Sequence, residues 1–278
     1  MSTWLITGAS RGLGLEITRA ALAEGHYVAA TARDTAALHA EFPDAGDALL
    51  AVPLDVTDED QAYAAAASAV DRFGGVDVLV NNAGRGLLGA VEEVTDRAAR
   101  AVFDTNVFGT LNVLRAVLPV MRRRRSGHVI NISSVGGFTG TPGWGVYAAT
   151  KFAVEGFSEA LQQELAPLGL QVTIVEPGLF RTDFLDASSL HTQQTSFPEY
   201  EVSVGATRES AVKGNHAQPG DPAKAARIIV ALAQNPAAPL RLQLGADAVT
   251  RVEAKLDLVR GELADWRALS RSTDSAAL

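Results

Sequence analysis

The sequence contains no cysteine and only five histidines among its 278 residues. The lack of cysteine excludes disulfides, thiolate catalysis and cysteine-ligated zinc, and it agrees with an intracellular address. The histidines are scattered without metal-ligand spacing, so we expect no metal site.

Long apolar runs and a basic excess are also missing. No run of about 18 apolar residues is present, so no membrane-spanning helix is predicted. The net charge of −8 and the pI near 5.2 argue against a nucleic-acid partner. No basic stretch followed by an apolar segment precedes the first strand-like run, so we expect no signal peptide and a cytoplasmic location. One basic cluster, RRRR at residues 122–125, favours a solvated helix end over an anion-binding patch.

What the chain does contain is an alternation of short apolar β-rich runs and longer alanine-rich helical runs. Strands are predicted at 3–7, 26–32, 48–56, 76–82, 128–134, 171–177 and 240–245, with helices near 13–25, 57–73, 96–120, 147–166 and 221–234. Such apolar runs are typical of strands buried on both faces. We therefore predict an α/β fold of Rossmann-like, doubly wound type: a mostly parallel seven-stranded sheet with helices on both faces, in a single domain over 1–278.

Two segments depart from this regularity. Residues 184–220 are polar and too long for an idle connection, which indicates a substrate loop or lid. Residues 246–269 form a C-terminal helical extension, with an apolar stripe of Val249, Val252, Leu256, Val259 and Leu263.

One turn of predicted helix carries Tyr147 and Lys151, and side chains four residues apart lie side by side. A phenol titrates near 10, so bringing its pKa to about 7 requires roughly 4 kcal/mol of preferential stabilisation of the phenolate. A neighbouring ammonium supplies charge of the right sign. The alternative is a phenol that simply packs on a lysine stem.

The stretch TGASRGLG, residues 7–14, lies between a predicted strand and a predicted helix. Glycine there permits a tight turn and lets backbone approach a pyrophosphate at a helix N-terminus. Its glycines, Gly8, Gly12 and Gly14, follow the spacing GxxxGxG; a plain turn is the alternative.

Six features in order resemble the short-chain dehydrogenase/reductase family over roughly residues 3–245. They are TGxxxGxG, NNAG at 81–84, Asn106, ISS at 132–134, YxxxK at 147–151 and PG at 177–178. The resemblance implies an oxidoreductase that interconverts a carbonyl and an alcohol by hydride transfer. It makes Tyr147 the catalytic acid/base, gives Lys151 a second role on the nicotinamide ribose, and assigns Asn106 to a proton relay through water. Ser134 matches the catalytic serine better than Ser133, for which a backbone-bonded hydroxyl is expected.

The resemblance also implies a set of cofactor-binding residues. They are Gly8, Ser10, Arg11, Gly12, Leu13, Gly14, Arg33, Asp55, Val56, Asn82, Ala83, Gly84, Tyr147, Lys151, Pro177, Gly178 and Thr182. Within this set, Asp55 resembles the acid that meets the adenine amino group, the alternative being an N-cap for the helix near Thr57.

The choice of dinucleotide depends on residues 32–34. Asp34 lies about 20 positions after the glycines, which favours NAD(H). However, Ala32 occupies the strand's last position, and Arg33 behind it resembles the residue that holds a 2′-phosphate, with Arg11 as a second candidate. We favour NADP(H), and Asp34 then pairs with Arg33 or caps a helix.

The leading prediction is an NADP(H)-dependent carbonyl reductase or alcohol dehydrogenase acting on an apolar small molecule. An NAD-dependent dehydrogenase of the same family and a non-catalytic nucleotide sensor on the same fold are the alternatives. The resemblance also implies a homodimer formed through the helices near 96–120 and 147–166.

Overall fold

The computed structural model describes residues 1–194 and 196–275. Seven strands form one sheet in the order β3-β2-β1-β4-β6-β7-β9, and every neighbouring pair is parallel. The strands are β1 (Thr3–Ile6), β2 (Tyr27–Ala32), β3 (Leu49–Pro53), β4 (Val78–Asn81), β6 (Gly127–Ile132), β7 (Leu170–Pro177) and β9 (Arg241–Leu244). The order reverses between β1 and β4, which confirms the doubly wound fold and creates a crevice at that switch point.

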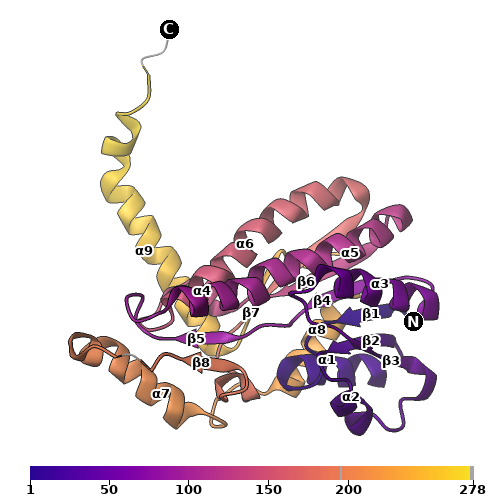
Figure 1. The fold of residues 1–278 in the computed structure, drawn as a ribbon. Coiled ribbons are helices and arrows are strands. Elements are labelled where there is room, and N and C mark those ends of the chain that lie inside the picture. The colour runs from indigo at the N-terminus through magenta and orange to yellow at the C-terminus, as the bar shows by residue number, and fades with distance from the viewer. Residues whose placement is uncertain (195, 276–278) are drawn as a thin grey trace.

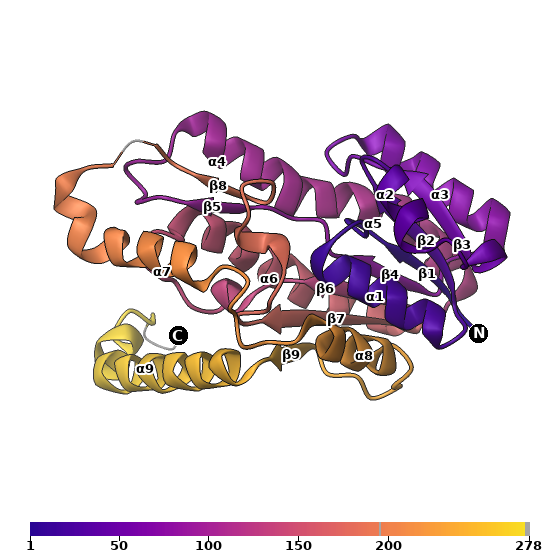
Figure 2. The same ribbon diagram turned by 90° about the horizontal axis from the view of Figure 1, so that it is seen from below.

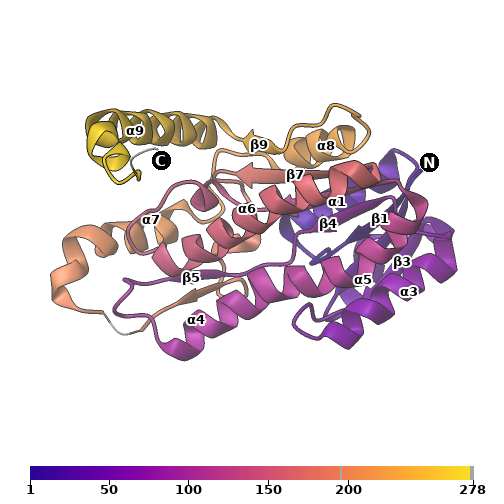
Figure 3. The same ribbon diagram turned by 90° about the horizontal axis from the view of Figure 1, so that it is seen from above.

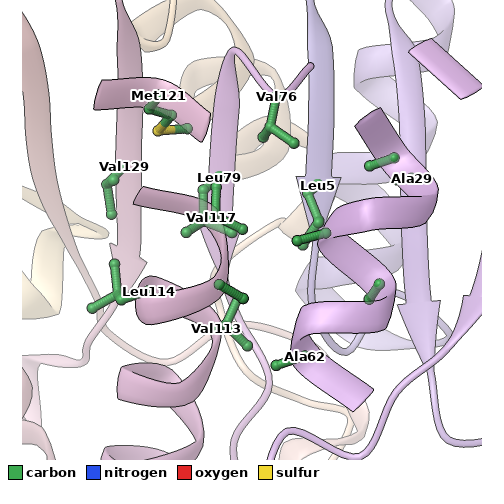
Figure 4. Packing of buried hydrophobic residues seen from close by; sticks show 14 of the residues in the cluster. Leu5, Ala29, Ala62, Val76, Leu79, Val113, Leu114, Val117, Met121 and Val129 are labelled. Carbon is green, nitrogen blue, oxygen red and sulfur yellow. The ribbon is translucent and has the colours of Figure 1, made fainter. Parts of the chain in front are cut away.

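Helices cover both faces of the sheet (Figures 1 and 3). One face carries α3 (Glu59–Phe73), α5 (Gly109–Arg124) and α6 (Gly145–Leu165), whereas the other carries α1 (Gly12–Ala23), α2 (Ala36–Glu41) and α8 (Pro222–Leu232). Figure 4 shows the first core, where Val113 and Val117 of α5 pack on Leu79 of β4. The strands are therefore buried on both sides, as their continuous apolar runs predicted.

Local chemistry explains where several helices begin and end. Asp58 caps α3 by accepting a hydrogen bond from the Gln61 amide, and α3 ends at Gly74 in the left-handed region. Asp221 caps α8 in the same way, with Pro222 as the first helical residue.

The helix predicted at 96–120 is two helices joined by a π-helical turn. α4 (Asp96–Phe103) runs through the π-helix Asp104–Phe108 into α5. The basic cluster ends α5 with structural bonds: Arg124 pairs with Asp77 at 2.8 Å, and Arg125 donates to the Pro167 carbonyl. These bonds and the exposure of the cluster agree with a solvated helix end.

The polar segment 184–220 has more structure than its sequence suggested. It contains β8 (Leu190–Thr192), which pairs in parallel with β5 (Gly86–Leu88), and α7 (Ala206–Gly214). Short 3-10 turns lie at Gly46–Ala48, Val135–Gly137, Ala166–Leu168, Asp183–Leu185 and Pro198–Tyr200, and a second π-helical turn lies at Glu201–Gly205.

The helix expected over 246–269 is α9 (Ala246–Arg271), which projects away from the sheet (Figures 1 and 2). Among the described residues, no helix combines the length and apolar character needed to cross a membrane.

Candidate active site

A cavity of about 1310 Å³ opens at the carboxyl ends of the parallel strands. Its lining draws on the turns that follow β1, β2, β3, β4, β6 and β7, which is where doubly wound folds bind ligands. Every residue that the sequence assigned to catalysis or cofactor binding lines it, except Gly14 and Asn106. The predicted residues therefore share one cavity, apart from those two, which have other positions.

The glycine turn is shaped for a backbone-to-ligand approach. Gly8 and Gly12 have φ of 64° and 55°, in the left-handed region that disfavours other residues. A Cβ on Gly14 would lie 2.3 Å from the Gly8 carbonyl oxygen and 2.4 Å from Asn82 Nδ2, so Gly14 fits tight packing beneath the turn. The Asn82 amide donates to the carbonyls of Thr7 and Gly8 and ties the turn to the end of β4.

Beyond the turn, α1 begins at Gly12 with no side-chain cap and no acidic residue in its first turn. Its first amide groups are thus left for a ligand at the positive end of the helix dipole. A pyrophosphate fits this arrangement, because it needs both close backbone approach and donors without an opposing carboxylate.

The residues after β2 settle how Asp34 is used. Its carboxylate accepts a hydrogen bond from the Ala36 amide at 2.9 Å in the turn before α2, and among the described residues it forms no ion pair with Arg33. Arg33 is exposed on the cavity wall, and within 1–194 and 196–275 no carboxylate forms an ion pair with it. Arg11 also lines the cavity, but its guanidinium donates to the Ser188 carbonyl at 2.9 Å.

Asp55 does not cap the helix that follows. Its carboxylate accepts from the amide and hydroxyl of Thr57, at 3.0 and 2.8 Å, because Asp58 already caps α3. The capping alternative for Asp55 is therefore wrong, and its side chain lines the cavity beside Val56.

The catalytic candidates converge at the start of α6. Tyr147 is 7% exposed, and its ring lies 5.6 Å from that of Trp144 and 5.5 Å from that of Phe184, centroid to centroid. Lys151 is buried one turn further, with Nζ 6.0 Å from the Tyr147 ring centroid. That Nζ donates to the Ile132 carbonyl at 2.9 Å, so the ammonium is fixed to the end of β6.

Burial dominates the titration of this pair. It raises the pKa of Tyr147 to about 12, against a smaller lowering by a hydrogen bond with Ser134. It also lowers the pKa of Lys151 to about 8, although the charge of Glu155 favours the ammonium. In the protein chain alone, burial therefore keeps the phenol weakly acidic. The expectation that Lys151, together with an oxidised nicotinamide cation, makes the phenol acidic stays a prediction.

The two serines at the end of β6 point to different partners. Ser134 lines the cavity, accepts a hydrogen bond from the Gly136 amide and bonds with Tyr147. The Ser133 hydroxyl faces Glu155, not backbone as expected, because α6 carries that carboxylate over the strand end.

Comparison with known proteins identifies the family that this geometry belongs to. The family profile described as "short chain dehydrogenase" matches residues 2–193. The chain is a short-chain dehydrogenase/reductase. As a member of this family it is an oxidoreductase that works with a nicotinamide dinucleotide.

Individual relatives extend this likeness over the whole chain. The chain is 40% identical to Oxidoreductase BOA17 of Botryotinia fuckeliana over 268 residues, 96% of this chain and 97% of that protein. A short-chain dehydrogenase from Streptomyces avermitilis has 46% identity and a TM-score of 0.90, with 99% and 100% of the two chains covered. The structure described as ElxO with NADP bound has 26% identity and a TM-score of 0.75, with 90% and 100% covered.

Asn106 of this dehydrogenase/reductase lies in the π-helical turn and is 1% exposed. Its amide accepts from the Arg85 amide and donates to the Arg85 carbonyl and to the Thr150 hydroxyl. The side chain thus holds the strand-like segment after β4 against α6. Its assignment to a proton relay stays a prediction.

The sequence did not reveal the residues that attach segment 184–220 to the rest of this enzyme. The Glu93 side chain is fully buried, accepts from the amides of Ala90 and Phe197, and pairs with Arg208 of α7. Burial alone would raise the pKa of Glu93, but the two amides and the Arg208 charge bring it below its usual value. A lone acid in a polar stretch carries no sequence signal for this role.

Two residues of α9 also reach the site without having been predicted. Asp247 accepts from the Leu179 amide at 2.9 Å and occupies the space that a Cβ on Gly178 would need. Arg251 lines the cavity and donates to the hydroxyls of Thr139 and Thr141, at 2.7 and 2.8 Å. The sequence did not predict these two contacts, because the helical periodicity of 246–269 indicates the apolar stripe and not the roles of the polar residues beside it.

Segment 184–220 also brings acidic groups near a histidine. Asp183, Asp186 and His216 have potential ligand atoms within 4.8 Å of one another. Asp186 already accepts hydrogen bonds from Asn215 and His216, so these side chains are engaged with each other.

Proposed function

We propose that this oxidoreductase uses NADP(H) to interconvert a carbonyl and a primary or secondary alcohol, with Tyr147 as its acid/base. The supporting observation is that Tyr147, Ser134 and Lys151 line the same cavity as the glycine turn. Bound nicotinamide supplies or accepts the hydride in such chemistry.

Each catalytic side chain has a proton task that its surroundings support. With a pKa near 12, Tyr147 carries its proton at neutral pH and delivers it to the substrate oxygen in the reductive direction. Ser134 bonds with the phenol and orients the substrate oxygen beside it. Lys151 keeps a positive charge near the ring and stabilises the phenolate that remains.

The preference for NADP(H) rests on Arg33. Its guanidinium is exposed on the wall of the cavity, and a planar fork of donors suits a 2′-phosphate. ElxO, a structural neighbour, was solved with NADP. NAD(H) is the alternative, but the Asp34 carboxylate that would bind a ribose hydroxyl is held by the Ala36 amide.

We propose an apolar carbonyl compound or alcohol as the substrate and residues 184–220 as its lid. The rings of Trp144, Tyr147 and Phe184 pack against one another at the cavity, with Trp144 and Phe184 stacked at 6.3 Å. Phe184 and Gln218, at the two ends of the lid segment, both line the cavity. Arg251 adds one cation that a polar substituent of the substrate would meet.

The cofactor assignment is tested by titrating NADPH and NADH while following tryptophan fluorescence. Arg33→Ala should weaken NADPH binding by about 10- to 100-fold, the value of hydrogen bonds to a charged group, and leave NADH binding unchanged. Asp34→Ala is the matched control and should alter neither. Loss of NADH binding in the Asp34 variant would support the NAD-dependent alternative, and tight NADPH binding without turnover of any carbonyl would support a sensor.

We also propose a homodimer built on the outer faces of α5 and α6. Phe152 on α6 and Phe108, at the end of the π-helical turn before α5, are exposed, which is unusual for phenylalanine and agrees with an interface. Light scattering at micromolar concentration should give at least twice the chain mass, whereas a monomer would contradict the proposal.

A further inference from the structure

The C-terminal helix α9 leaves the body of the protein after its first two turns (Figures 1 and 2). Of its residues only Ala248 and Val252 are buried, in a small cluster with Val135 and Phe138. The remainder of α9 makes no buried apolar contact within the described residues.

The apolar residues of this projecting part follow a strict repeat. Spacings of three and four residues alternate along Val249, Val252, Leu256, Val259, Leu263 and Trp266. Apart from Val252, these side chains are 43% to 62% exposed. An alternating three-four spacing is the a/d pattern of a coiled coil, in which the apolar seam packs on another helix.

The projecting helix also lacks support from its own chain. Gly261 lies in its interior, where glycine is destabilising by about 0.5–1 kcal/mol relative to alanine. Most helical stability in proteins comes from packing of an apolar face, and the described residues supply no such packing for the projecting part of α9. The exposed apolar stripe of α9, here called the seam, therefore requires packing against a partner helix.

We propose that the partner is α9 of a second copy of this chain, in an antiparallel two-stranded coiled coil. The register places Leu256 against the partner's Val259, and Val249 against the partner's Trp266. A two-fold axis between the helices then repeats each contact, which makes the interface closed and self-complementary. Val252 is 7% exposed and packs on Val135 and Phe138 of its own subunit, so the seam consists of Val249, Leu256, Val259, Leu263 and Trp266.

Charges beside the seam select this arrangement. Glu253 and Arg260 occupy e positions, and Lys255 and Glu262 occupy g positions. In the antiparallel register, Glu253 faces the partner's Arg260 and Lys255 faces the partner's Glu262, so all four symmetric pairs are attractive. A parallel pair would instead place Lys255 beside the partner's Arg260.

The remaining side chains are compatible with this surface. Arg260 pairs with Asp257 at 3.1 Å, but both are largely exposed, and such pairs contribute little. Leu258 and Leu269, also exposed, widen the apolar stripe on the side of Lys255 and Glu262. The seam is separate from the faces of α5 and α6, so the two interfaces are independent.

The lack of cysteine makes a cross-linking experiment clean. Val249→Cys and Trp266→Cys are made separately in the full chain, and disulfide-linked dimers are measured for each alone and for the mixture under mild oxidation. Antiparallel pairing predicts cross-linking in the mixture only, because identical positions would lie about 25 Å apart along the axis. Cross-linking of each variant with itself would indicate a parallel pair, and no cross-linking would overturn the proposal.

Charge variants provide a second measurement that introduces no cysteine. Glu253→Arg should weaken self-association in sedimentation velocity by on the order of tenfold, since two attractive pairs become repulsive. Adding Arg260→Glu to the same chain restores opposite charges across the axis and should recover the association. Asp265→Arg, which lies off the seam, is the control and should change nothing. Failure of the swap to restore association would contradict the register.

Discussion

The proposed nucleotide side of the cavity is shaped by turns at the ends of adjacent strands, whereas its proposed substrate side is built from side chains of the segment 184–220, α6 and α9. On the nucleotide side, Gly8, Gly12 and Asn82 shape turns at the ends of adjacent strands. On the substrate side, Phe184 from the lid and Arg251 from α9 join residues at the start of α6. Each turn of the first side carries its own short sequence signal, although Gly8 and Asn82 lie 74 residues apart, whereas the residues of the second side carry no such local signal. Substrate preference is therefore free to change without disturbing the dinucleotide site.

The largest expected effect lies where the two sides meet. Tyr147→Phe removes the proton donor but keeps the ring that packs on Trp144 and Phe184. Turnover should fall by about 10²- to 10⁴-fold, while cofactor affinity measured by fluorescence stays within twofold. Tyr200→Phe, which removes only an exposed bond to Glu92, is the control. Comparable loss of cofactor binding in the Tyr147 variant would show that the two sides are not separable.

A change at Glu93 should affect the substrate side alone. Glu93→Gln removes the charge that pairs with Arg208 and holds the Phe197 amide. We expect about 3 kcal/mol less stability in denaturant unfolding, because the Arg208 cation, whose side chain is only 19% exposed, loses its partner, together with a raised KM. Glu92→Gln, one residue away and exposed, should do neither. An unchanged KM for the Glu93 variant would show that the attachment of the proposed lid, residues 184–220, does not affect substrate binding.

Gly14→Ala should affect the nucleotide side alone. The added Cβ would meet the Gly8 carbonyl and the Asn82 amide, so the turn must shift, at a cost of about 1–3 kcal/mol. Cofactor binding should weaken with it, as isothermal titration would show. Gly156→Ala has open space around its Cβ on α6 and should stabilise the fold by about 0.5–1 kcal/mol. Wild-type affinity in the Gly14 variant would mean that the turn tolerates movement.

The smallest effect concerns Glu155, beneath the site. Burial raises the pKa of Glu155 to about 7 from 4.5. The uncharged carboxyl is favoured in the fold, so its contribution to stability is full below pH 4.5 and is lost as the pH rises through 7. Glu155→Gln cannot ionise, so its unfolding free energy relative to wild type should rise by on the order of 2 kcal/mol between pH 5 and 8.

Glu159 provides the matched control for this pH dependence. It also bonds to Arg241 but is exposed, so Glu159→Gln should show no such slope. Parallel pH profiles for wild type and the Glu155 variant would contradict the buried-acid interpretation.

The accuracy of the sequence predictions follows the same division between the two sides. The strands, the glycine turn and the YxxxK pair were predictable because each signal lies within a few consecutive residues. The pairing of β5 with β8 and the role of Glu93 were not, since both depend on contacts about 100 residues apart. The burial that raises the pKa of Tyr147 in the chain alone was not predictable, because the pattern shows which charges are near but not how much water is removed.

The π-helical turn at Asp104–Phe108 fixes the length of the chain between α4 and α5. An α-helix turns by about 100° per residue. The hydrogen bonds of a π-helical turn enclose one residue more than those of an α-helical turn. Losing one residue there would rewind the segment as ordinary helix and swing α4 around its axis, taking the Asn106 amide off the Arg85 backbone. At the positions of this turn other than Asn106, substitution should therefore be tolerated more readily than deletion.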